Sequence, residues 1–91
     1  MPAEFGACCC LREHLTAREI DVLCEAAVGH HNSQIAENLN LSVHTVAQHM
    51  TSMLHKAHEP SRTALVSRAL RIGILTMNQQ GPRATGRRCL R

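Results

Sequence analysis

Two short helical patterns separated by a few turn-forming residues place the strongest constraint on how this chain folds. They lie in residues 32–57, which read NSQIAENLNLSVHTVAQHMTSMLHKA. Ser and Asn precede helices because their side-chain oxygens accept hydrogen bonds from unpaired backbone N–H groups. We therefore expect one helix from a cap at Asn32 or Ser33 to about Leu39, and a second from a cap at Ser42 to about Ala57. The turn of about three or four residues between them is typical of a helix-turn-helix, whose second helix can enter a DNA major groove.

The flanking sequence predicts two more helices. Thr16 and Glu19 form a T-x-x-E capping box, and an apolar stripe at helical spacing follows it as far as Gly29. Ser61 predicts the start of a last helix that runs to about Leu75 and is apolar on more than one face. We therefore expect an all-α fold, a four-helix bundle that contains the helix-turn-helix.

This domain is expected to span residues 15–75. Residues 1–14 show no clear period and are expected to be a flexible segment, and residues 76–91 a basic, flexible tail. No apolar run of about 18 residues is present and the first residues do not resemble a secretory signal, which predicts a soluble, cytoplasmic protein without a membrane partner.

Composition and charge restrict the kind of nucleic acid that this chain could bind. Phe5 is the one aromatic residue, which argues against single-strand modules that stack bases on aromatic rings. The formal charge is −1 over residues 1–14, zero over 15–75 and +4 over 76–91. Because Lys and Arg supply most of the affinity for phosphates, the neutral central segment predicts a weak electrostatic contribution to DNA binding.

Several stretches together resemble one known family. They are LTAREIDVL at 15–23, Gly29, QIAENLNLS at 34–42, TVAQH at 45–49, Lys56, Arg62 and ALRIGIL at 69–75. In this combination the chain resembles the LuxR-type DNA-binding domain, also called GerE-like or NarL-like, over residues 15–75. Region 4 of bacterial sigma factors shares the opening LTxRE and a similar central segment, but the helix from Arg62 fits the LuxR type better.

The resemblance implies that the third helix reads double-stranded DNA and that the fourth joins two copies into a homodimer. The residues that it places at DNA are Asn32, Ser33, Ser42, Thr45, Ala47, Gln48, His49, Thr51, Ser52 and Lys56. The residues that it places in the dimer contact are Leu65, Val66, Ala69, Leu70 and Ile74. RNA polymerase is a further candidate partner. No catalytic residue, metal or cofactor is implied.

Two departures from the family pattern bear on affinity. The family commonly has a basic residue after TV, where this chain has Ala47, and further basic or polar groups where this chain has Met50 and Thr51. Gln48 is the strong base reader that remains, because its amide can bond adenine in two places. We therefore expect modest, salt-sensitive binding to a specific site.

Five cysteines leave a second chemistry open. Cys8, Cys9 and Cys10 are adjacent, and thiolates can bind zinc or react when their pKa falls. Structural zinc sites space their cysteines apart, however, and an odd total disfavours a complete disulfide framework. The leading interpretation is a sequence-specific transcriptional regulator or its output domain, not an enzyme. The alternatives are a protein-interaction module with weak DNA binding and a cysteine-based redox or metal sensor.

Overall fold

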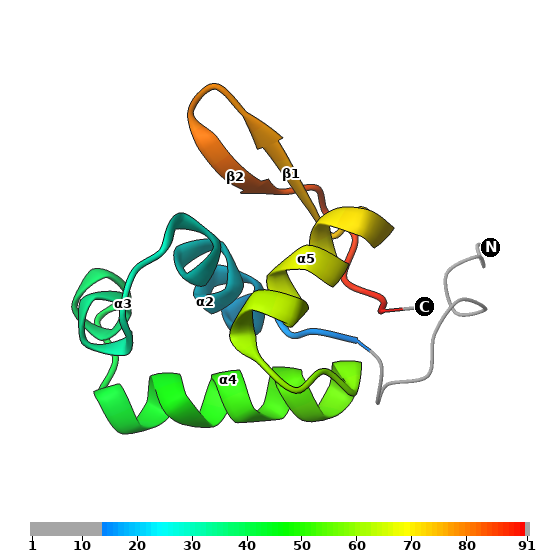
Figure 1. Ribbon diagram of the computed structural model, residues 1–91. Coiled ribbons are helices and arrows are strands. Elements are labelled where there is room, and N and C mark those ends of the chain that lie inside the picture. Colours follow the sequence, from blue (N-terminus) through cyan, green and yellow to red (C-terminus); the bar gives the residue numbers. More distant parts are fainter. Residues whose placement is uncertain (1–13, 91) are drawn as a thin grey trace, which may run out of the picture.

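The computed structural model describes residues 14–90, and its first helix, α2 (Ala17–Val28), begins and ends where the sequence predicts (Figure 1). The Thr16 hydroxyl accepts a hydrogen bond from the Glu19 N–H at 3.1 Å, and the Glu19 carboxylate accepts one from the Thr16 N–H at 2.8 Å. Gly29 ends the helix in the left-handed conformation, with φ of 107°. Both ends are confirmed because caps depend on residues within one helical turn.

The helix-turn-helix consists of α3 (Asn32–Leu39) and α4 (Val43–Ala57). The predicted cap of α4 is confirmed, because Ser42 Oγ accepts a hydrogen bond from the Thr45 N–H at 3.0 Å. The predicted cap of α3 is wrong. The N-cap residue is His31, and its side chain makes no capping hydrogen bond.

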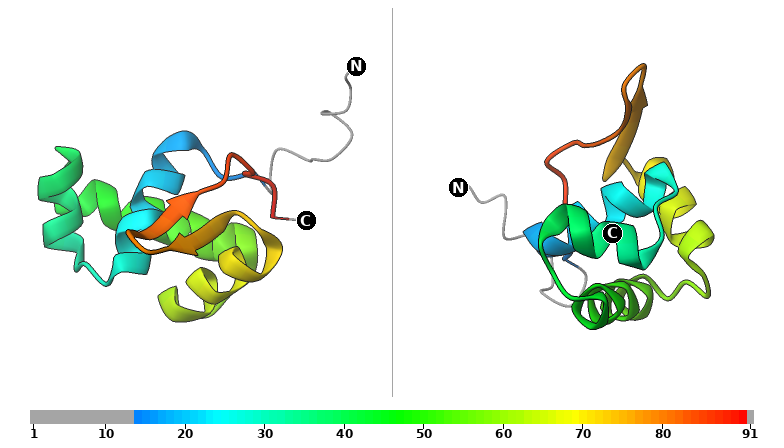
Figure 2. Two further views of the ribbon diagram at one scale, coloured as in Figure 1. Left: turned by 90° about the horizontal axis from the view of Figure 1, so that it is seen from above. Right: turned by 90° about the vertical axis from the view of Figure 1, so that its left-hand side faces the viewer.

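The core is one aliphatic cluster to which every helix contributes. Its buried members are Leu15, Ile20, Val22, Leu23, Ala26, Ile35, Ala36, Val46, Met50, Met53, Ala57, Leu65, Ala69, Ile74, Leu75 and Leu90. Removing this much apolar surface from water is the main favourable term in folding. Four of these residues come from α4 at helical spacing, so the orientation of α4 depends on the core. Figure 2 shows the ribbon from two further sides.

The last helix, α5 (Arg62–Ile72), is shorter than the sequence predicts. Ser61 caps it as expected, since its hydroxyl accepts a hydrogen bond from the backbone of the first turn at 3.2 Å. Gly73 then ends the helix in the left-handed conformation, with φ of 90°. The chain turns inward so that Ile74 is fully buried, and a strand begins at Leu75.

A two-stranded hairpin follows α5. Strand β1 (Leu75–Asn78) pairs antiparallel with β2 (Gly81–Ala84), and the hairpin rises on the side of the molecule opposite α4 (Figure 1). The chain then returns to the body, where Cys89 and Leu90 are buried. There the Arg88 carbonyl accepts a hydrogen bond from the Leu15 N–H, near the first described residue, at 2.8 Å.

These contacts correct two expectations. Over residues 14–90 the fold is four helices with a small two-stranded sheet, not purely all-α, and a four-helix bundle in the strict sense is not confirmed. The segment predicted as a flexible tail instead forms most of a hairpin, and the chain after it ends with Cys89 and Leu90 buried. Its polar composition concealed the apolar residues at its two ends, Leu75 and Leu90, which fix it to the core.

The remaining expectations about the N-terminal segment fall outside the described residues. These include the flexibility of residues 1–13 and the chemistry of Cys8, Cys9 and Cys10. Within residues 14–90, no helix is both long enough and apolar enough to cross a bilayer.

A charged pair lies at the edge of the core. Glu19 is 3% exposed, and the Lys56 ammonium donates to its carboxylate at 2.8 Å and to the His14 carbonyl at 2.9 Å. Burial by itself raises the pKa of Glu19. Hydrogen bonds from Lys56, the Thr16 N–H and the Ser52 hydroxyl outweigh burial, so the pKa of this carboxyl lies below its ordinary value. Lys56 thus ties the end of α4 to the start of α2.

The first prediction concerns this pair. Lys56→Ala leaves the buried Glu19 carboxylate without its partner, so we expect the free energy of unfolding to fall by about 3 kcal/mol at neutral pH. Arg18→Ala is the matched control, because it breaks a pair with Asp21 at 3.6 Å between side chains that are about half exposed. We expect this control to cost less than about 1 kcal/mol.

Acid should reduce the difference between the two variants. Because the pKa of Glu19 is lowered by folding, its contribution is complete above the unfolded pKa and is lost as the pH falls through the folded pKa. Urea denaturation at neutral pH and in acid measures both effects. Equal decreases in the free energy of unfolding for Lys56→Ala and Arg18→Ala at neutral pH would contradict this account.

Candidate nucleic-acid interface

Helix α4 has two faces of opposite character. The inner face buries Val46, Met50, Met53 and Ala57, and the outer face exposes His44, Gln48, Thr51 and His55. The other helices and the hairpin all lie on one side of α4, which runs along one border of the molecule (Figure 1). The polar outer face is therefore accessible to a partner as large as a DNA duplex, as the helical spacing predicts.

The first residue of α4 differs from the prediction. Helical spacing would put Val43 on the same face as Val46 and Met50, but Val43 is 50% exposed. The reason is its position directly after the turn, where the helix has not yet reached the core cluster. Residues at the start of a recognition helix contact base edges, and apolar groups there can pack against the thymine methyl. Val43 is a candidate contact that apolar periodicity alone could not identify.

The cap and the first turn of α4 carry two hydroxyl groups that are bonded to each other. Ser42 Oγ accepts from the Thr45 N–H and donates to Thr45 Oγ1 at 2.9 Å. The Thr45 hydroxyl proton is then available to donate to an outside acceptor such as a phosphate oxygen. The structure thus brings the two predicted phosphate contacts together at the start of α4.

The start of α3 is built differently from the prediction. Ser33 is exposed, but Asn32 is half-buried, and its side-chain oxygen accepts a hydrogen bond from the Arg62 guanidinium. Arg62 also donates to the His30 carbonyl at 3.4 Å. Asn32 therefore joins α3 to the first residue of α5. The side-chain NH₂ group of Asn32 is then the donor that can bond to a phosphate oxygen.

A polar network fixes the other side of α3. Glu25 of α2 accepts a hydrogen bond from Asn38 at 2.7 Å and from His30 Nδ1 at 2.7 Å. Asn38 in turn accepts a hydrogen bond from Gln34 at 2.9 Å. The hydrogen bond from Asn38 is the main reason that the pKa of Glu25 lies below its ordinary value. α3 buries only Ile35 and Ala36, so these polar contacts contribute to its position.

The other predicted DNA contacts separate into two groups. Ala47 and His49 are half-buried and flank the exposed residues of α4. Ser52 and Lys56 instead donate hydrogen bonds to the buried carboxylate of Glu19, and Lys56 is also its ion-pair partner. The family resemblance places Lys56 at DNA, but its ammonium is paired with Glu19. Within residues 43–57 the exposed polar groups are uncharged side chains and histidines.

The residues expected in the dimer contact are mostly buried in this chain's own core. Leu65, Ala69 and Ile74 are fully buried, Val66 is half-buried and Leu70 is 37% exposed. Leu65, Ala69 and Ile74 are therefore not on the surface, as a dimer contact would require. The sequence predicts that α5 is apolar on more than one face, and the face with Leu65 and Ala69 packs into the core of its own chain. Leu70 and Val66 form the part that a second copy could reach.

Comparison with known proteins agrees with this geometry. The model of the family described as bacterial regulatory proteins, luxR family, matches residues 13–69. Among similar proteins, the nitrate/nitrite response regulator protein NarP of Escherichia coli is 43% identical over 67 residues, covering 74% of this chain and 28% of that protein.

Two further relatives have similar extents. The HTH-type transcriptional activator RamA of Corynebacterium glutamicum is 39% identical over 61 residues, which is 67% of this chain and 22% of RamA. The uncharacterized transcriptional regulatory protein YxjL of Bacillus subtilis is 42% identical over 65 residues, or 71% of this chain and 30% of YxjL. The chain thus spans less than a third of the length of these relatives.

The second prediction separates the structural and the binding role of the turn. Ser42→Ala and Ser61→Ala each remove one N-cap hydrogen bond, at α4 and α5 respectively, so each should cost about 1 kcal/mol of stability. Only Ser42 adjoins the candidate interface. We expect Ser42→Ala alone to weaken duplex binding, by about two- to tenfold. Equal affinities for the two variants in a fluorescence-anisotropy titration would exclude a contact at this turn.

Proposed function

The chain belongs to the luxR family of bacterial regulatory proteins and is a DNA-binding domain of a transcriptional regulator, and on that premise we propose that α4 enters the DNA major groove with its outer face against the bases. The observation that carries this proposal is the division of α4 into a buried apolar face and an exposed polar one. An α-helix fits the major groove, where each base pair presents a distinct pattern of donors and acceptors.

Base recognition is assigned to the middle of the exposed face. Gln48 donates from its amide nitrogen and accepts at its amide oxygen, which matches the two groups of adenine in the major groove. Thr51 lies on the same face, nearly one turn further along, and its hydroxyl can bond to more than one base. Val43 and Ala47 offer methyl groups to thymine. We propose that the preferred site is rich in A·T pairs where α4 lies.

Phosphate contacts are assigned to the starts of the two helices. Ser42 and Thr45 at α4, and Asn32 and Ser33 at α3, place hydroxyl and amide groups next to helix N-termini, whose backbone dipoles favour anions. Few Lys or Arg side chains take part, because Lys56 is held by Glu19. We propose that binding is modest and that shape and hydrogen bonds contribute more than net charge.

A homodimer through α5 is the proposed assembly. Leu70, with Val66 beside it, is the apolar part of α5 that remains exposed, and the patch is small. We propose that the two copies pair weakly in solution and firmly on DNA that carries two half-sites related by a two-fold axis. Sedimentation velocity with duplexes carrying one or two half-sites tests this, and a single copy bound to the two-site duplex would refute it.

The regulatory context follows from the same premise. We propose that the chain acts on DNA in the cytoplasm as a regulator rather than as an enzyme, with RNA polymerase as a second partner. The two alternatives raised by the sequence are not favoured, since both the family and the relatives are described as regulators. A run-off transcription assay with purified polymerase tests the second partner.

The third prediction concerns base recognition by Gln48. We expect Gln48→Ala to lower affinity for the preferred duplex, found by selection from a random library, by about tenfold while leaving affinity for random duplex unchanged. Gln79→Ala is the matched control, because Gln79 is also exposed but lies in the hairpin turn opposite α4. If Gln48→Ala binds the selected duplex as tightly as Gln79→Ala does, α4 does not read bases through this residue.

A further inference from the structure

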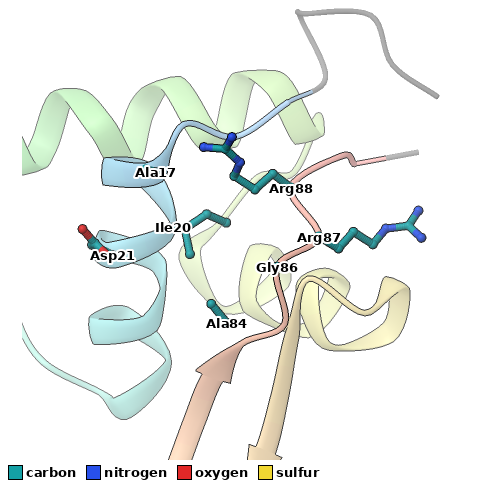
Figure 3. A pocket seen from close by; sticks show the side chains of 7 residues that line it. All are labelled: Ala17, Ile20, Asp21, Ala84, Gly86, Arg87 and Arg88. Atoms are coloured by element: carbon teal, nitrogen blue, oxygen red, sulfur yellow. The ribbon is translucent and has the colours of Figure 1, made fainter. Parts of the chain in front are cut away.

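A groove of about 220 Å³ lies between the start of α2 and the chain that follows β2 (Figure 3). Ala17, Ile20 and Asp21 line it from α2, and Ala84, Gly86, Arg87 and Arg88 line it from the C-terminal segment. Residues after 69 lie outside the part of the chain that the family model matches. One wall of this groove is therefore formed by residues that follow the matched part.

The C-terminal wall is held in place by backbone hydrogen bonds. The Leu15 N–H donates to the Arg88 carbonyl at 2.8 Å, and the Thr85 N–H donates to the Ile74 carbonyl at 3.1 Å. Arg68 of α5 donates to the Leu90 carbonyl at 3.2 Å. A ligand would meet a preformed groove, so binding costs little ordering of the protein.

The groove combines an apolar floor with a positive border. Ile20 lies between Arg88 and Ala84, and the Arg88 side chain extends toward α2, whereas Arg87 points away (Figure 3). The Asp21 carboxylate on the border is 3.6 Å from the Arg18 guanidinium, which balances its charge. Among residues 14–90, no hydrogen bond or ion pair engages the Arg88 guanidinium. Arg87 and Arg88 therefore give this border of the groove an excess of positive charge.

The size of the groove favours a single side chain over a free small molecule. Sites that enclose small molecules usually measure about 300–1,000 Å³. This groove is smaller, and a free ligand would leave much of its surface in water. One aliphatic side chain of a larger partner fits better, because protein interfaces concentrate their affinity in a few anchor residues seated in pockets.

We propose that this groove binds an acidic segment of a partner protein, with one aliphatic side chain on Ile20, Ala17 and Ala84 and a neighbouring carboxylate on Arg88. A DNA backbone fits less well, because it has no aliphatic group for the floor. The site also lies away from the outer face of α4 (Figure 1). The proposal does not depend on how α4 reads DNA.

The test uses three capped tripeptides and the nitrogen-15-labelled 91-residue chain. Acetyl-Glu-Leu-Glu-amide should give saturable NMR shifts at the amides of Ala17, Ile20, Ala84 and Gly86. Acetyl-Glu-Ala-Glu-amide should bind several-fold more weakly because it lacks the anchor, and acetyl-Lys-Leu-Lys-amide should give no saturable shift. Shifts that are absent, lie elsewhere or are the same for all three peptides would overturn the proposal.

Two variants and one control locate the charge. Arg88→Gln should lower the affinity for acetyl-Glu-Leu-Glu-amide by about two- to fivefold. Arg71→Gln, which removes an exposed arginine on α5, should leave that affinity unchanged. Ala17→Glu adds a negative charge in the groove at a helix start that tolerates it, so it should abolish binding while the chain stays folded. Equal effects of Arg88→Gln and Arg71→Gln, or the same amide shifts with random duplex DNA, would refute a site for acidic peptides.

Discussion

The anchoring of α4 from beneath is the constraint on which the rest of this structure depends. Val46, Met50, Met53 and Ala57 hold the helix to the aliphatic cluster, and the Lys56–Glu19 pair fixes its far end to the capping box of α2. Because these contacts use the inner side of α4, the outer side is left polar and exposed. The Glu19 carboxylate thus completes the capping box of α2 and also positions α4 through Lys56. The stability of the domain and the orientation of its interface are therefore linked.

The sequence predicted well those features that depend on neighbours along the chain. The capping box at Thr16 and the caps at Ser42 and Ser61 are confirmed, because each involves residues within one turn of one another. Features set by distant residues were predicted poorly. Whether Lys56 is free or paired depends on Glu19, 37 positions away, and Asn32 is held by Arg62, 30 positions away.

Periodicity also could not say which of several apolar faces is covered. Leu65, Ala69 and Ile74 were assigned to a partner, yet they complete the core of their own chain. The hairpin escaped prediction because strands β1 and β2 have four residues each and no clear apolar alternation. The segment is instead attached to the core by Leu75 and Leu90 at its two ends. The C-terminal segment, which follows the part matched by the family model, forms one side of a groove remote from the proposed DNA contact.

The most direct test of the central claim is to map a selected duplex onto the full chain by NMR. The account predicts the largest amide shifts at the start of α3 and along α4 from Ser42 to His55, with the hairpin from Leu75 to Ala84 unchanged. Largest shifts in the hairpin or in the groove beside Arg88, with none at Gln48 and Thr51, would contradict it.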